Sequence, residues 1–225
     1  MHILIFCTGL LSLYSLVHTQ RLNNAEPSAD PVRSMFMGWC AGAFCALTGI
    51  AAFLLSQDPT LHVENATPSL GFHAFTIALS AGVTEEIAFR GILLTLLMKL
   101  FSRMRQGVLI AALIDCGLFV LSHYNQARSP FFYGLVFVWA ILLTVSAIRT
   151  QALWLPIGLH TGYDTVQTVA GGVHVPALAS MKGVLYIEPE YLPYSFTLHA
   201  IVPVLLVVLV LRYKPKLVAA RLLLQ

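Results

Sequence analysis

Seven ionisable side chains occur inside stretches of the sequence that are otherwise apolar, in three separate segments. They are Glu85, Glu86, Arg90, Asp115, His123, His160 and Asp164. A charged side chain within a membrane is costly, so each of these positions is a candidate functional residue. A lone His or Asp in a membrane helix is about as often a hydrogen-bonding group between helices as a catalyst, but seven together favour one common site. Carboxyl and imidazole groups are the usual proton acceptors and donors of enzymes, which makes acid–base catalysis the predicted chemistry.

The composition predicts an integral membrane protein. Of the 225 residues, 58% are hydrophobic and only 10% are charged, which lies outside the range of ordinary soluble domains. The net charge of +3 is small and the Lys and Arg residues are scattered, so the lipid bilayer is an expected partner and a nucleic acid is not. The four cysteines lie in apolar segments without a CxxC or Cys/His zinc spacing, and we expect them to be small buried apolar residues.

Seven apolar runs are long enough to form membrane helices, which need about 17 to 25 residues. They cover residues 2–19, 35–56, 70–101, 107–124, 131–148, 151–170 and 196–212. The first run lacks the basic start and the cleavage site of a signal peptide, so we interpret it as a helix. We therefore expect an all-α, polytopic transmembrane helical bundle of about seven helices, in a single domain over residues 1–225.

The basic residues predict the orientation of these helices. If all seven runs cross the membrane, ten Lys and Arg residues fall on one side and only Arg128 and Lys182 on the other. Because cytoplasmic loops carry the excess of positive charge, the N-terminus is expected outside and the C-terminus in the cytoplasm. We expect the membrane to be a bacterial or archaeal cell membrane.

Helical geometry predicts that four of the ionisable groups reach one depth. With a rise of about 1.5 Å per residue, Glu85 lies roughly 21 Å above Lys99, and His123 roughly 27 Å above Arg105. By the same count, His160 and Asp164 lie roughly 16 and 22 Å above the basic residue at position 149. All four fall in the outer half of a core about 30 Å thick.

The remaining ionisable groups are expected to support this site. Arg90 and Asp115 lie lower in the membrane and can pair with each other, or Arg90 can pair with Glu86, which is one helical turn away. Glu85 and Glu86 are about 100° apart on a helix, so they cannot both point at one water unless the helix bends. We expect Glu85 to face the cavity and Glu86 to be held by Arg90. Phe119 and His123 are one turn apart and share a helix face, as do the two residues at 160 and 164.

Three short motifs carry a resemblance to a known family. "EEIAFR" (85–90), "FVLSH" (119–123) and "HTGYD" (160–164) resemble, in this order, the EExxxR, FxxxH and HxxxN/D motifs of the CPBP (CAAX protease and bacteriocin-processing) family. Members are intramembrane glutamic endopeptidases related to the CAAX prenyl endopeptidase. The match covers residues 79–167, the motif core.

The resemblance implies a role for each matching residue. Glu85 would be the general base that activates a water, and His123 would hold and polarise that water. His160 and Asp164 would stabilise the oxyanion, whereas Glu86, Arg90 and Phe119 would support the site. At position 164 the chain has Asp where the family can carry Asn. Either burial keeps Asp164 neutral, so that it donates to the oxyanion, or it orients His160 as a carboxylate behind the ring.

Zinc chemistry and serine chemistry are the alternatives to this mechanism. Two His and two carboxyl groups could bind zinc, but the HExxH helix of many zinc proteases is absent. We therefore expect no cofactor, with zinc as the alternative. Ser122 has no GxSxG context and is expected on another side of its helix from His123.

The expected partner is a membrane-anchored protein or peptide. We expect the chain to cleave an anchored or exported protein close to its membrane segment, at a C-terminal sorting signal or in a CAAX-like position. The 171–195 loop could contact this substrate, although its composition fits a plain interfacial loop equally well. The alternatives are a non-catalytic membrane scaffold or bacteriocin-immunity-type protein, and a proton-coupled transporter, against which the lack of an inverted repeat counts.

Overall fold

The computed structural model describes residues 30–56, 68–124, 130–171, 202–206 and 208–209. The described residues form helices and no strand, which confirms the all-α class for this part of the chain. The elements are α2 (Pro31–Ser56), α3 (Pro68–Glu86), η1 (Ile87–Leu93), α4 (Leu94–Leu100), α5 (Gly107–Ser122), α6 (Pro130–Thr150) and α7 (Trp154–Gly171). The predicted helix 2–19, most of 196–212, nearly all of the 57–69 loop and all but the first residue of the 171–195 loop lie outside the described residues, so the seven-helix count stays a prediction.

Several helices are apolar along their length and on their exposed faces. Pro31–Ala51 and Tyr133–Thr150 are long and apolar enough to cross a membrane, and Gly107–Ser122 is a shorter apolar helix. Large apolar side chains, such as Phe44, Leu96 and Leu113, are exposed on the outer faces of the helices. In lipid these faces have an apolar solvent, so they need no covering protein layer.

Proline marks the start of three helices. Pro31, Pro68 and Pro130 each occupy the first position of a helix, where the missing N–H has no partner to lose. Asp30 caps α2, because its Oδ1 accepts a hydrogen bond from the backbone N–H of Val32 at 2.9 Å. This cap and the proline that follows it start α2 four residues before the apolar run expected at 35–56.

The predicted helix 70–101 is continuous but not uniform. Its middle, η1, is a π-helix, in which the N–H of Leu94 bonds to the carbonyl oxygen of Phe89, five residues earlier. A π-helical turn widens the helix and changes the direction of the side chains around it, and such turns often occur at functional sites. Here η1 begins directly after Glu86 and contains Arg90.

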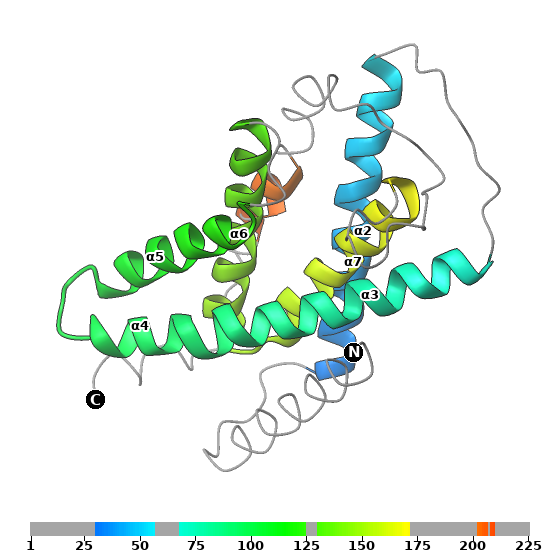
Figure 1. The fold of residues 1–225 in the computed structure, drawn as a ribbon. Helices are drawn as coiled ribbons and strands as arrows, with labels where there is room; N and C mark the ends of the chain where they lie inside the picture. Colours follow the sequence, from blue (N-terminus) through cyan, green and yellow to red (C-terminus); the bar gives the residue numbers. More distant parts are fainter. Residues whose placement is uncertain (1–29, 57–67, 125–129, 172–201, 207, 210–225) are drawn as a thin grey trace.

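The helices pack around α7. Helices α3, η1 and α4 follow one line, and α5 turns back beside α4, while α6 runs across them (Figure 1). Helix α7 packs against both α2 and α3. The buried core where α2, α5, α6 and α7 meet includes Phe119, Trp139, Leu142 and Leu159.

Two pairs of glycines lock α2 and α7 together. Gly38 and Gly42 on α2 face Gly158 and Gly162 on α7, and both pairs have the GxxxG spacing that lets membrane helices approach closely. A Cβ atom added at Gly38 would lie 2.5 Å from the carbonyl oxygen of Leu155. A Cβ at any of the other three glycines would overlap the backbone of the facing helix in the same way. This packing fixes α7 along the turn that carries His160.

The burial of the cysteines depends on which side of a helix they occupy. Cys45 and Cys116 are buried, as expected, but Cys40 is exposed. Cys40 lies two residues from each α2 glycine, about 200° around the helix, so it faces away from α7. The prediction was wrong for this residue, and Cys7 lies outside the described residues.

Candidate active site

The structure brings together the four side chains that the sequence placed at one depth. Glu85 comes from the end of α3, His123 from the residue that ends α5, and His160 and Asp164 from α7. Glu85 Oε2 lies 3.8 Å from His123 Nε2 and 3.8 Å from His160 Nε2. His160 Nε2 lies 3.4 Å from Asp164 Oδ2. Their roles in a reaction stay a prediction, but their meeting point is a feature of the fold.

The two carboxylates stand at the open side of this cluster. The side chains of Glu85 and Asp164 are 33% and 31% exposed, against 15% for His123 and 10% for His160. A separation of 3.8 Å is too long for a direct hydrogen bond. It suits groups that share a small partner such as a water, which can bond to both.

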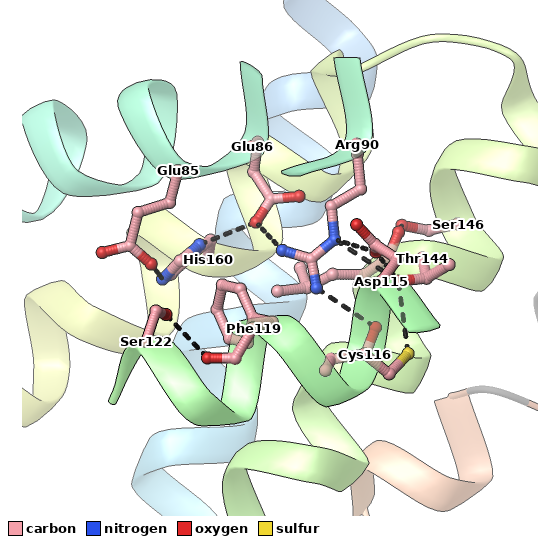
Figure 2. A network of polar contacts seen from close by, with 12 residues as sticks. Glu85, Glu86, Arg90, Asp115, Cys116, Phe119, Ser122, Thr144, Ser146 and His160 are labelled. Carbon is pink, nitrogen blue, oxygen red and sulfur yellow. Dashed lines mark hydrogen bonds and ion pairs between the residues drawn. The ribbon is translucent and has the colours of Figure 1, made fainter. Parts of the chain in front are cut away.

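Glu86 lies behind the cluster and is completely buried (Figure 2). Its Oε1 is 3.0 Å from Arg90 Nη1, which matches the expectation that Arg90 holds Glu86. The same oxygen is 2.9 Å from His160 Nδ1, a contact that the sequence did not predict. Glu85 and Glu86 therefore do not meet at one water. They lie at the two nitrogens of one imidazole ring.

The guanidinium of Arg90 is buried and has partners on every side. Its Nε lies 3.5 Å from Asp115 Oδ2 and 3.4 Å from Thr144 Oγ1, and its Nη2 donates to the carbonyl oxygen of Ala140 at 3.3 Å. Arg90 thus pairs with both Asp115 and Glu86, the two partners that the sequence predicted as alternatives. The charged group also lies 4.2 Å from the centre of the Phe119 ring, which is within the range of a cation–π interaction.

Phe119 also contacts the histidines. Its ring centroid is 4.7 Å from that of His123 and 6.0 Å from that of His160. The Phe119 ring thus packs against Arg90 and against both imidazoles. It is an apolar wall that fixes the positions of polar side chains on η1, on α7 and at the end of α5.

The backbone fixes the tautomer of His123. His123 Nδ1 lies 2.8 Å from the carbonyl oxygen of Phe119, which can only accept, so Nδ1 is the nitrogen that carries hydrogen. In the neutral ring Nε2 then has a free lone pair, and this nitrogen faces Glu85.

Ser122 contacts His123 after all. Its Oγ lies 3.1 Å from His123 Nδ1, so the expectation that it faces another side was wrong. The reason is local, because α5 ends at Ser122 and the backbone of His123 leaves the helical geometry. The hydroxyl donates to the carbonyl oxygen of Phe119 at 2.7 Å. Since Nδ1 donates as well, His123 cannot take the proton of Ser122 at this nitrogen, and the pair lacks the geometry of an activated serine.

The surroundings of His160 consist of hydrogen-bond acceptors. Nδ1 donates to Glu86, while Nε2 faces Asp164 Oδ2 at 3.4 Å and Glu85 Oε2 at 3.8 Å. Each ring nitrogen therefore has a carboxylate acceptor, which suits a ring with hydrogen on both nitrogens. The position of Asp164 beside Nε2 fits the second of the two predicted alternatives, in which it orients the ring.

The four side chains at the open cluster are chemically capable of binding zinc. Within the part of the chain that the structure describes, no group of three or more His, Cys, Asp or Glu residues has the arrangement of a metal site.

Some site features were missed by the sequence analysis although the sequence contains a signal for them. Thr144 is one of the few polar residues within the apolar run of α6, and it lies against Arg90. The two GxxxG pairs on α2 and α7 were readable as spacings. The π-helix η1 has no comparable signal in one sequence.

Comparison with known proteins identifies the domain that holds the site. The family model of the type II CAAX prenyl endopeptidase Rce1-like family matches residues 67–166, which include every site residue named above. This segment is therefore similar to the Rce1-like family, in agreement with the predicted resemblance to the CPBP family. The matched family consists of integral membrane proteases.

A bacterial relative is similar over a longer stretch. The uncharacterized 24.3 kDa protein of Escherichia coli is 28% identical over 154 residues, which cover 64% of this chain and 69% of the relative. No solved structure matches the chain significantly.

Proposed function

We propose that the chain is an intramembrane glutamic endopeptidase with Glu85 as the general base. The observation that carries this proposal is the position of Glu85 Oε2, at 3.8 Å from the Nε2 atoms of both His123 and His160. A water between these groups has one hydrogen for the Glu85 carboxylate and one for the free lone pair of His123. Its own lone pairs are then directed away from both acceptors, toward an incoming peptide carbonyl.

Hydrolysis follows from this arrangement. Glu85 takes a proton from the water while the water oxygen bonds to the carbonyl carbon. The negative charge moves to the carbonyl oxygen, which accepts a hydrogen bond from His160 Nε2. When the C–N bond breaks, Glu85 returns the proton to the leaving nitrogen, so base and acid are the same group. Glu86 holds Nδ1–H of His160 at 2.9 Å, and Asp164 fixes the edge that carries Nε2.

The proposed substrate is a membrane-anchored or exported protein, cut close to its membrane segment. Support comes from the domain family, whose members act on membrane-anchored proteins, and from the partial exposure of Glu85 and Asp164 on one side of the cluster. The asymmetry of the basic residues favours entry from the outer face and a cytoplasmic C-terminus. Under this orientation a C-terminal sorting signal is the favoured target, and the reverse orientation favours a CAAX-like role.

Cleavage by the purified full chain in liposomes tests the mechanism. Two synthetic probes are offered, a farnesylated CAAX peptide and a single-span peptide with a polar juxtamembrane segment, and products are identified by mass spectrometry. We expect cleavage by the wild type and loss of at least a thousandfold in Glu85→Gln, which keeps the shape but removes the base. The matched control is Asp30→Asn, a carboxylate-to-amide change at a helix cap, where Asn is an equally good residue.

Two further results would contradict the proposal. If the Glu85→Gln variant cleaves as the wild type does, the chain acts by another mechanism or serves as a scaffold. If a chelator abolishes wild-type cleavage and added zinc restores it, the metal-independent mechanism is wrong.

Reporter fusions test the orientation separately. A phosphatase that is active only outside the cytoplasm is inserted in the 57–69 or the 171–195 loop. We expect activity from both positions, and a cytoplasmic location of either loop would reverse the proposed face of entry.

A further inference from the structure

The buried clamp, defined as Arg90, Asp115 and Thr144, joins three helices behind the site (Figure 2). Thr144 Oγ1 donates to Asp115 Oδ2 at 2.9 Å and lies 3.4 Å from Arg90 Nε. The side chains of all three residues are buried. A hydroxyl is the group that fits here, because it donates to the carboxylate and accepts from the guanidinium at the same time.

The clamp is connected to His160 through one oxygen atom. Glu86 Oε1 accepts from Arg90 Nη1 at 3.0 Å and from His160 Nδ1 at 2.9 Å. The position of Arg90 therefore sets the position of the oxygen that orients the imidazole. Thr144 is linked to Glu86 through Arg90, which bonds to both residues. Thr144 itself contacts neither His160 nor the open side of the cluster.

The clamp is also connected to His123. Asp115 and His123 lie on the same helix, separated by eight residues, which is slightly more than two turns. The contact of Asp115 with Arg90 fixes α5 against η1 at 3.5 Å. This contact thereby sets where the end of α5 places His123 relative to Glu85.

We propose that Thr144 and Asp115 are positioning residues of the peptidase, which act on the two histidines through Arg90. The inference rests on the proposed function, because it assigns these residues an effect on the rate of cleavage. Neither residue faces the open side, so substrate binding does not depend on them directly. The expected signature is a fall in kcat with an unchanged KM.

Substitutions at Thr144 test the role of its hydroxyl. Thr144→Val keeps the shape and removes the hydroxyl, and we expect kcat to fall at least tenfold on whichever of the two liposome probes the wild type cleaves. Thr144→Ser keeps the hydroxyl and should restore kcat to within threefold of the wild type. The control is Ser146→Ala on the same helix, where a buried hydroxyl donates only to the carbonyl oxygen of Leu143 at 2.8 Å. It should leave kcat unchanged.

Asp115→Asn gives a second, independent approach if the valine variant accumulates poorly. The amide keeps the shape but weakens the contacts with Arg90, so kcat should again fall at least tenfold at constant KM. In an Arg90→Met background, Thr144→Val should cause no further loss, because its route to the site is already broken. Additive losses would show that Thr144 does not act through Arg90.

Nuclear magnetic resonance of ¹⁵N-histidine-labelled protein gives a readout without substrate. The signals of His160 are assigned by comparison with His160→Asn. Thr144→Val should shift the Nδ1 signal of His160, whereas Ser146→Ala should leave it in place. The inference is overturned if Thr144→Val has a wild-type kcat, or the His160 signal of the wild type, while Glu85→Gln is inactive. Cleavage retained by Glu85→Gln would instead overturn the proposed function itself.

Discussion

The contact between α3 and α7 at Gly82 sets the spacing of the site. Gly82 lies one turn before Glu85 and Glu86, and it faces Thr161, the neighbour of His160. A Cβ added at Gly82 would lie 2.7 Å from Thr161 Oγ1 and 3.2 Å from Thr161 N. Gly82→Ala must therefore separate the glutamates from the histidine, unless the threonine yields.

The size of this separation follows from the contact distance. Ordinary van der Waals contact begins near 3.4 Å, so relief of the 2.7 Å contact requires about 0.7 Å. The same movement would lengthen the hydrogen bond between Glu86 and His160 from 2.9 Å to as much as about 3.6 Å, which is beyond hydrogen-bonding range. Misplacement by about 1 Å can cost roughly 100-fold in rate. We expect Gly82→Ala to lower kcat between about 10- and 100-fold.

A second substitution shows whether the overlap is the cause. Thr161 Oγ1 is buried without a hydrogen-bond partner, so Thr161→Ala alone should have little effect, and the Gly82→Ala/Thr161→Ala double variant should regain most of the activity. The control is Gly71→Ala on the same helix, where an added Cβ meets nothing within 4 Å. Rates are measured with the liposome assay at equal amounts of folded protein. A wild-type kcat for Gly82→Ala, or a double variant no better than the single one, would refute the reasoning.

Three further substitutions test separate parts of the structure. Arg90→Lys should lower kcat at least tenfold in the liposome assay, because an ammonium cannot replace a planar guanidinium that has partners along all its edges; a wild-type rate would show that charge alone suffices. Ser122→Ala should keep kcat within threefold, since the hydroxyl donates to the carbonyl oxygen of Phe119, and a thousandfold loss would revive a serine mechanism. Gly158→Ala should lower the Tm in detergent by several degrees relative to Gly117→Ala, where an added Cβ meets nothing within 4 Å; equal Tm values would argue against tight packing of α2 on α7.

The helices that the structure describes were predictable because their apolar runs are long enough for a membrane helix, and three of these helices also begin at a proline. The site was predictable because Glu85, His123 and His160 lie on three such runs at similar heights, and a regular helix converts sequence distance into depth. The resemblance of three motifs then gave the order and the roles. These inferences use only the regular geometry of single helices and the order of short motifs, and both can be read from one sequence.

Other features depend on contacts between helices. The position of Ser122 was predicted wrongly because α5 ends there, and a helical wheel does not apply beyond the last turn. The link from Glu86 to His160 follows from how α3 and α7 pack, which is decided by glycines that leave space and not by the charged residues. Thr144 gave a weak signal because a threonine in a membrane helix commonly bonds to its own backbone.

The two adjacent glutamates lie at opposite nitrogens of one imidazole ring, and this geometry separates the roles that we propose for them. Glu86 Oε1 bonds to Arg90 Nη1 at 3.0 Å and to His160 Nδ1 at 2.9 Å, whereas Glu86 Oε2 is buried without a hydrogen-bond partner among the described residues. The position of Oε1 between these two groups suits Glu86 to orient the His160 ring. Glu85 is partly exposed and touches the ring only at 3.8 Å, which leaves its oxygen available for a proton. Exchange of the two roles would require rotation of the helix by about 100°, against the contacts of Arg90 with α5 and α6. Under the proposed function, the clamp behind the site therefore fixes which of the two glutamates can act as the base.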